Sequence, residues 1–178
     1  MSGPTVRAFN ELWYRKAPRR RTAELQTVGA FFHPLDGVRD WNRLYGRAGL
    51  VQYQFVLPDP EGGRLARVIE AIATSAHPSF LAVLKRFGPG NAGPLSFPTA
   101  GWTLAVDFPA APGLAQLLAR LDAEVVEGGG RLYLAKDARS TPTLLAATYP
   151  GLDRFREIRA RLDPHRRFQS DLSRRLDL

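Results

Sequence analysis

The sequence contains no cysteine, and only three of its 25 basic residues are lysine. The missing cysteine excludes a disulfide bond, a thiol nucleophile and a thiolate metal site within the chain. The three histidines, His33, His77 and His165, lack metal-ligand spacing, so no metal site is expected. No apolar run is long enough to span a membrane, and the first residues have no signal-peptide hydrophobic stretch. These absences predict a globular, cytoplasmic protein.

Positive charge is what the chain has in excess. The formal net charge is +8, and the densest basic run is RKAPRRR at residues 15–21. Such a run is attracted to the phosphates of nucleic acid or to an anionic membrane surface. A solvated loop without a partner explains the run equally well. Charge alone therefore leaves the partner open.

The scarcity of lysine draws attention to the positions where it occurs. A site that keeps lysine in an arginine-rich chain requires a compact ammonium group, because a planar guanidinium does not fit the same space. Lys136 lies in the stretch GGRLYLAKDAR, at residues 129–139, which reads as a strand entered through a glycine turn. On a strand it would share a face with Leu132 and Leu134. The simpler alternative is that its flexible stem carries the amine past the strand end to water.

The order of elements predicts the fold class. Strands are expected at residues 50–57, 79–87, 102–108 and in the stretch with Lys136. One helix follows the first strand, with Asp59 as N-cap and Pro60 as its first residue, and another ends at the glycines 128–130. The apolar positions of the two helices are Leu65, Val68, Ile69 and Ile72, and then Leu114, Leu117, Leu118, Leu121 and Val125. The β-α-β-β-α-β order predicts an α+β protein with a ferredoxin-like split βαβ antiparallel sheet, two helices on one face, and a helical C-terminal tail.

Alternation along the strands sorts the side chains of the sheet onto two faces. The helices are expected to cover Tyr53, Phe55, Phe80, Leu84, Trp102, Leu104, Val106 and Phe108. The opposite face is expected to carry Gln52, Gln54, Val56, Leu81, Val83, Lys85, Phe87, Thr103, Ala105 and Asp107. Polar groups set into an uncovered apolar surface are typical of a binding face. The alternative is that the first fifty residues fold over it.

The two ends of the chain give weaker signals. The clusters at 31–36 and 41–45 are interpreted as loop anchors of an N-terminal segment with few periodic positions. In the tail, Ser140 is expected to cap a short helix, and a longer helix is expected to end at Asp163-Pro164. The tail is then expected to anchor through Phe168. Because it does not fit inside the predicted sheet unit, it requires another body to pack on.

Long segments of the chain resemble a known family of FAD-linked oxidases. The segments are VRAFNELWYRKAPRRR, FFHPLDGVRDWNRLYG, QYQFVLP, SFLAVLKRFGPGNAGPLSFPTAGWTLAVDFP, GGRLYLAKDAR and DPHRRFQSDLSRRLDL. They resemble the C-terminal part of the decaprenylphosphoryl-β-D-ribose 2′-oxidases, of the vanillyl-alcohol-oxidase type, whose C-terminal region is similar to that of aldonolactone oxidases. Family members carry a FAD-binding domain upstream, and nothing in this sequence corresponds to it.

The resemblance implies a domain division and a set of site residues. Residues 1–130 would form the substrate domain, and residues 131–178 would return to the FAD domain, which this chain lacks. Lys136, with Tyr133 beside it, would lie next to the flavin and act in catalysis. The substrate would contact Gln52, Gln54, Lys85, Phe87 and Thr103. Thr103 and Ala105 replace polar and cysteine side chains of family members, so individual substrate contacts differ.

The resemblance also implies a reaction and partners. The family transfers a hydride from the ribosyl C2 of a polyprenyl-phosphate sugar to FAD, and a separate reductase completes the epimerisation to the arabinose precursor of the cell wall. Such a lipid substrate fits the basic N-terminal run and a location at the inner face of the plasma membrane. Without a FAD domain the chain is not expected to be catalytic alone, and it would be a fragment, half of a split enzyme or a decayed product.

Two other functions are kept as alternatives. Aldonolactone oxidases, such as D-arabinono-1,4-lactone oxidase, tend to have His-Trp ahead of the lysine, where this chain has Tyr133-Leu134. A ferredoxin-like fold with basic loops can also bind RNA through aromatic residues on its bare sheet face. The sequence lacks the RNP-type pattern, and the bare face offers only Phe87 as an aromatic residue. Nucleic acid is therefore the less favoured partner.

Overall fold

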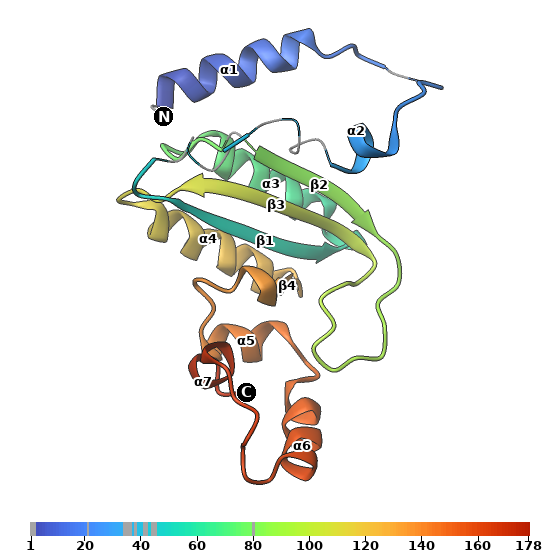
Figure 1. The fold of residues 1–178 in the computed structure, drawn as a ribbon, viewed down its shortest axis with the longest axis vertical. Helices are drawn as coiled ribbons and strands as arrows, with labels where there is room; N and C mark the ends of the chain where they lie inside the picture. Colours follow the sequence, from blue (N-terminus) through green and yellow to red (C-terminus); the bar gives the residue numbers. More distant parts are fainter. Residues whose placement is uncertain are drawn as a thin grey trace.

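The computed structural model describes residues 3–20, 22–33, 37, 39–40, 43, 46–79 and 81–178. A four-stranded antiparallel sheet forms its centre, with helices packed on one side and at both ends (Figure 1). The strands are β1 (Leu50–Pro58), β2 (Leu81–Phe87), β3 (Gly101–Pro109) and β4 (Arg131–Leu132). The α-helices are α1 (Gly3–Lys16), α2 (Val28–Phe32), α3 (Gly62–Ala73), α4 (Leu114–Glu127), α5 (Pro142–Thr148), α6 (Leu152–Leu162) and α7 (Asp171–Arg175). Short 3-10 helices in the described part of the chain include η2 (Asp59–Glu61) and η3 (Leu134–Lys136).

The strand order is β2-β3-β1-β4, and all neighbours are antiparallel. β1 pairs with β3 along its whole length, from Leu50 opposite Pro109 to Pro58 opposite Gly101. The α+β class is therefore confirmed, and the four strands and the helices α3 and α4 follow the expected β-α-β-β-α-β order. The expected strand at 79–87 begins at Leu81, and Phe80 lies outside the described residues.

The main core lies between the sheet and the helices α3 and α4, which cover the same face (Figure 1). The core positions expected from alternation are confirmed for the buried residues Tyr53, Phe55, Leu104, Val106 and Phe108. The five apolar residues expected on α4 are all buried. Each fully buried side chain of this size stabilises the fold by about 1.5–3 kcal/mol. Leu84 departs from the expectation because it is 47% exposed on the edge strand β2.

The start of α3 differs from the sequence expectation. Asp59 and Pro60 belong to η2, and α3 begins after Glu61 without a side-chain cap. The Asp59 carboxylate instead accepts a hydrogen bond from Arg86 on β2, at 2.8 Å. This long-range ion pair takes the carboxylate away from the helix terminus, which explains why the N-cap prediction was wrong.

A buried polar contact ties the segment after β4 to this core. The Tyr53 hydroxyl donates to Asp122 on α4 at 2.9 Å, and Arg139 contacts the other carboxylate oxygen at 3.2 Å. Burial, with Asp122 adding to it, raises the pKa of Tyr53 well above its ordinary value. Tyr53 therefore stays protonated and acts as a structural donor on the helix side of the sheet.

The N-terminal part contains a helix that the sequence pattern did not indicate. α1 and α3 contribute residues to one cavity, and the Asn10 side chain donates to the Ser79 carbonyl at 2.9 Å. Phe31 and Phe32 on α2 are about two thirds exposed, so their interpretation as anchors was wrong. The rest of the two proposed anchor clusters, apart from His33 and Arg43, lies outside the described residues. Among the described residues no helix has the length and apolar character needed to cross a membrane.

The C-terminal helices form a second, smaller core. Leu145, Tyr149, Leu152, Leu176 and Leu178 are buried together, and Leu95 from the loop before β3 packs against them. Burial raises the pKa of Tyr149 to about 12, and its hydroxyl donates to the Leu132 carbonyl at 2.5 Å. The cap of α5 is Thr141 rather than Ser140, because the Thr141 hydroxyl accepts from the Leu144 amide.

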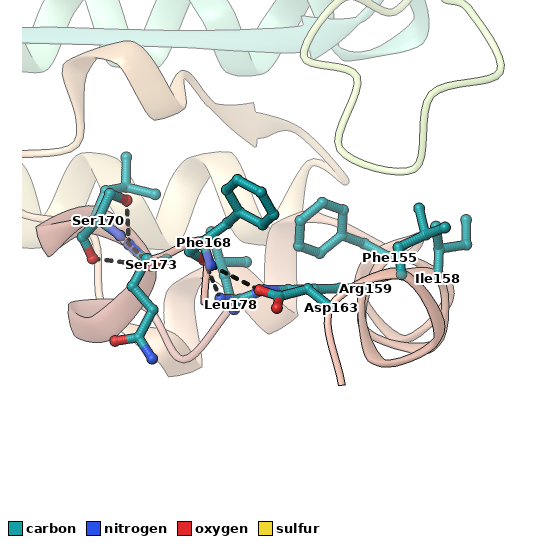
Figure 2. A pocket seen from close by; sticks show the side chains of 11 residues that line it. Phe155, Ile158, Arg159, Asp163, Phe168, Ser170, Ser173 and Leu178 are labelled. Carbon is teal, nitrogen blue, oxygen red and sulfur yellow. Dashed lines mark hydrogen bonds between the residues drawn. The ribbon is translucent and has the colours of Figure 1, made fainter. Parts of the chain in front are cut away.

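The end of the tail is held differently from the expectation. Phe168 is 82% exposed, so the prediction that it anchors the tail was wrong. It borders an apolar groove of about 580 Å³ between α6 and the last residues (Figure 2). The turn after α6 is stabilised by the Asp163 carboxylate, which accepts hydrogen bonds from the Arg167 and Phe168 amides. These bonds lower the pKa of Asp163, the Phe168 amide contributing most.

Candidate functional site

The face of the sheet that α3 and α4 leave uncovered carries the candidate site, and we call it the open face. Its side chains come from three neighbouring strands, so residues far apart in sequence lie in rows across it. Thr103 on β3 lies opposite Lys85 on one side and Val56 on the other. Ala105 lies opposite Val83 and Gln54 in the next row. The register thus places the amide of Gln54 within reach of the row that holds Lys85.

The open face is only partly accessible. Val83 and Lys85 on β2 are exposed, and Gln52, Gln54, Phe87 and Ala105 are half-buried. Val56, Thr103 and Asp107 are buried, which corrects the expectation of a uniformly bare face. The accessible part runs along the β2 side. The described residues of the N-terminal segment do not seal it, since these β2 side chains keep their exposure.

The loop between β2 and β3, residues 88–100, covers one end of the open face. Its Phe97 is 7% exposed and packs between two aromatic residues of the face. The Phe97 and Tyr133 rings are 4.5 Å apart, and the Phe87 and Phe97 rings meet edge to face at 5.8 Å. The three rings form an apolar wall beside the polar rows. Neither Phe97 nor this wall was singled out from the sequence, because the glycines and prolines around Phe97 indicate only a loop.

Arg131 on β4 fixes this loop to the sheet. Its guanidinium donates to the Ser96 carbonyl at 2.6 Å and approaches the Pro98 carbonyl at 3.4 Å. Arg131 lies opposite Val56, so its side chain belongs to the open face. Arg131, on the strand that precedes Lys136, therefore adds two polar contacts to the apolar packing of this loop.

Replacing Arg131 with methionine should loosen the loop while the sheet stays folded. The methionine keeps much of the packing but removes a charged donor, and a hydrogen bond to a charged group contributes about 1.5–3 kcal/mol. We expect faster amide hydrogen exchange at residues 88–100 and faster proteolysis there, with exchange in β1 and β3 unchanged. Equal protection in the two proteins would show that the apolar contacts of Leu95 and Phe97 hold the loop without Arg131.

Contrary to expectation, Lys136 does not lie on a strand and reaches the open face through a turn. β4 ends at Leu132, and residues 134–136 form the short helix η3. The Lys136 amide donates a hydrogen bond to the Tyr133 carbonyl across this turn. The chain turns because Leu134 packs into the second core. A strand continued to residue 136 would have placed Lys136 on the helix-covered side with Leu132, which belongs to the main core. The turn instead brings the Lys136 ammonium to the Gln52 side-chain oxygen, to which it donates a hydrogen bond.

The polar groups of the face form two adjoining contacts. Lys136 meets Gln52 at the β1 edge, and the Gln54 amide donates to the Thr103 hydroxyl at 3.2 Å. The Tyr133 amide donates to the Gln54 carbonyl at 2.9 Å, which joins the lysine segment to the same strand. All seven residues expected at the site lie on this face or at its rim: Gln52, Gln54, Lys85, Phe87, Thr103, Tyr133 and Lys136. Such a set of cations, amides and a hydroxyl can bind a ligand rich in hydroxyl groups and negative charge.

Comparison with known proteins identifies relatives of similar sequence, including two that match almost all of this chain. The chain is 48% identical over 174 residues to the decaprenylphosphoryl-β-D-ribose oxidase of Mycolicibacterium smegmatis, a match that covers 98% of this chain and 38% of that protein. It is 43% identical over 172 residues to a Streptomyces coelicolor protein described as an uncharacterised protein in the mprA 5′ region, covering 96% of this chain and 46% of that one. No family model matches the chain. The expected resemblance is confirmed, and the chain spans less than half the length of either relative.

Proposed function

We propose that this chain is the substrate-binding portion of a FAD-dependent oxidase that acts on the 2-hydroxyl of a polyprenylphosphoryl ribose. The identity to an oxidase of that substrate class supports the proposal. The observation that carries it is the Lys136 ammonium placed against Gln52 at the rim of the open face. Since the chain covers 38% of that relative, the remaining portion is proposed to hold most of the cofactor.

The residues present fit one edge of a flavin and not the whole dinucleotide. A partly exposed sheet face with an ammonium at its rim fits a flat, conjugated ring that becomes negatively charged at one edge. The glycines at 128–130 serve the end of α4 and the turn into β4, with Gly129 at φ +63°, so they do not form a phosphate cradle. When bound, the flavin supplies the hydride acceptor. Lys136 and Tyr133 are the residues proposed to lie beside it.

The chain's own residues would orient the sugar and stabilise charge. Lys136 would stabilise the developing negative charge and orient the reacting hydroxyl. Gln52 would exchange its contact with Lys136 for a hydrogen bond to a sugar hydroxyl, and Gln54 and Thr103 would exchange their contact with each other in the same way. Lys85, an exposed cation in the same row as Thr103, would pair with the substrate phosphate. The wall of Phe87, Phe97 and Tyr133 would exclude water from one side.

Mixing the chain with the unmatched portion of the relative tests this proposal. The partner is the part of the Mycolicibacterium smegmatis oxidase that this chain does not match, produced separately. We expect the mixture to show bound flavin absorbance and oxidation of a polyprenylphosphoryl ribose. The chain alone should show neither, because the residues that the structure describes offer no phosphate cradle for the rest of the dinucleotide.

Substrate competition separates the proposal from lactone oxidation. D-arabinono-1,4-lactone should be oxidised much more slowly than the polyprenyl-phosphate sugar by the same mixture. Faster lactone turnover would replace the proposed substrate class. A mixture that forms a flavin-loaded complex but oxidises neither compound would contradict the proposed activity.

A further inference from the structure

Helix α1 presents an apolar stripe that nothing in the proposed site uses. Phe9, Leu12 and Trp13 are 51%, 71% and 62% exposed. Their spacing, with Lys16 one turn further on, places them on one side of the helix. The Phe9 and Trp13 rings stack at 5.9 Å, and the Lys16 ammonium lies 5.6 Å from the Trp13 ring centre. The stripe is therefore one continuous apolar surface ending in a cation.

The rest of the helix faces the body of the protein. Asn10 is bound to Ser79 at the entry to β2. Arg7, Asn10 and Glu11 line a cavity together with Ile69 and Ile72 of α3. These contacts hold α1 against the protein with its stripe turned outward. The helix lies at the end of the molecule opposite α6 and α7, so the stripe has free approach to a flat surface (Figure 1).

Positive charge gathers at the end of this stripe. Arg15 and Lys16 occupy the last turn of α1, and Arg19 and Arg20 follow after Ala17 and Pro18. The single acidic side chain of the helix, Glu11, is bound to Arg15 at 2.7 Å. The surface is thus apolar along the helix and cationic where the helix ends, and its charge complements an anionic partner.

We propose that α1 with residues 17–20 is a membrane-docking surface for an anionic lipid bilayer. An amphipathic helix of this type lies in the plane of the interface, with its apolar side in the boundary between headgroups and acyl chains. The basic residues contact the anionic headgroups. This proposal rests on α1 alone and is independent of the activity proposed above.

The apolar composition favours a bilayer over nucleic acid. Leu12 is the most exposed residue of the stripe, and an aliphatic side chain offers no ring face on which a base can stack. Leu25 and Val28, in the segment that follows, are 100% and 73% exposed and equally unable to stack. A lipid interface accepts both aliphatic and aromatic side chains together with cations.

Vesicle co-sedimentation of the complete chain tests the proposal. We expect binding to phosphatidylglycerol–phosphatidylcholine vesicles to be at least about tenfold tighter than binding to pure phosphatidylcholine vesicles. The double substitution Leu12→Glu with Trp13→Glu should reduce that binding at least about tenfold. Leu162→Glu is the matched control, because Leu162 is 80% exposed on α6 at the opposite end and should have no effect.

A charge reversal provides a second variant that leaves the apolar stripe intact. Lys16→Glu with Arg19→Glu should weaken binding to anionic vesicles by well over about fivefold, since each basic residue near the surface contributes about that factor. Circular dichroism checks that both double variants keep the helical content of the parent. Three results would overturn the proposal: equal binding to neutral and anionic vesicles, unchanged binding by either double variant, or binding to a single-stranded oligonucleotide with none to vesicles.

Discussion

Replacing Lys136 with arginine is expected to lower the turnover of the reconstituted oxidase about a hundredfold while the chain remains folded. The ammonium is a compact donor that reaches Gln52 from the short turn η3. A guanidinium keeps the charge but is longer and planar, so it cannot place a point charge at the same position. The loss should appear in kcat with little change in the flavin content of the complex, because an interaction made in the transition state is removed.

Lys16→Arg provides the matched control for this substitution. Lys16 ends α1, a helix that lines one cavity with α3 and with the helix-covered residues Leu104 and Val106, and the substitution preserves its charge. It should leave turnover unchanged. If Lys136→Arg is as active as the control, Lys136 has no part in the reaction and serves only to hold the Gln52 side chain.

Gly101→Ala should lower the free energy of unfolding by about 3 kcal/mol or more. Gly101 begins β3 with φ at +155°, a conformation that side chains rarely adopt. A β-carbon there would lie 2.0 Å from the Leu57 carbonyl oxygen and 2.9 Å from the Pro58 α-carbon. Neither backbone atom can move without breaking the pairing of β1 with β3, so the substitution must separate the end of the two central strands. Chemical denaturation measures the effect.

Gly62→Ala is the control for the glycine substitution. A β-carbon at Gly62 has no neighbour within 4 Å, and its helical φ suits alanine. Reduced freedom of the unfolded chain should make this variant equal to the parent or more stable by about 0.4–1 kcal/mol. A Gly101→Ala protein as stable as Gly62→Ala would mean that the two central strands can separate at this end without loss of stability.

The proposed activity and the proposed membrane contact are supported by different parts of the molecule. The activity is supported by the polar rows of the open face and by similarity to a part of an oxidase. The membrane contact is supported by the exposed stripe and charge of α1. The vesicle experiment therefore does not test the oxidase proposal, which is tested separately by the mixing experiment. If both are correct, the bilayer would hold the protein beside a substrate whose polyprenyl chain is embedded in it.

Local patterns were sufficient where the interactions are local or repeat regularly. The 3.6-residue spacing on α4 predicted all five of its apolar core positions, and alternation placed Tyr53 and Phe55 correctly on the covered face. Both patterns follow from the geometry of a single helix or strand that packs one side against a neighbouring layer. They fail where a distant residue competes, as when Arg86 takes the Asp59 carboxylate from the helix terminus. They fail again where a side chain expected to pack finds no partner, as with Phe168.

The sequence by itself determined the α+β order, the two faces of the sheet and the resemblance to an oxidase, because each is encoded in spacing or in long matching segments. Only the tertiary structure decided how Lys136 reaches the open face. That position depends on Leu134 packing into a core built from residues 145–178, which turns the chain out of the strand after Leu132. Strand alternation ends where hydrogen bonding to the neighbouring strand ends, and no local pattern shows where a distant core will interrupt it.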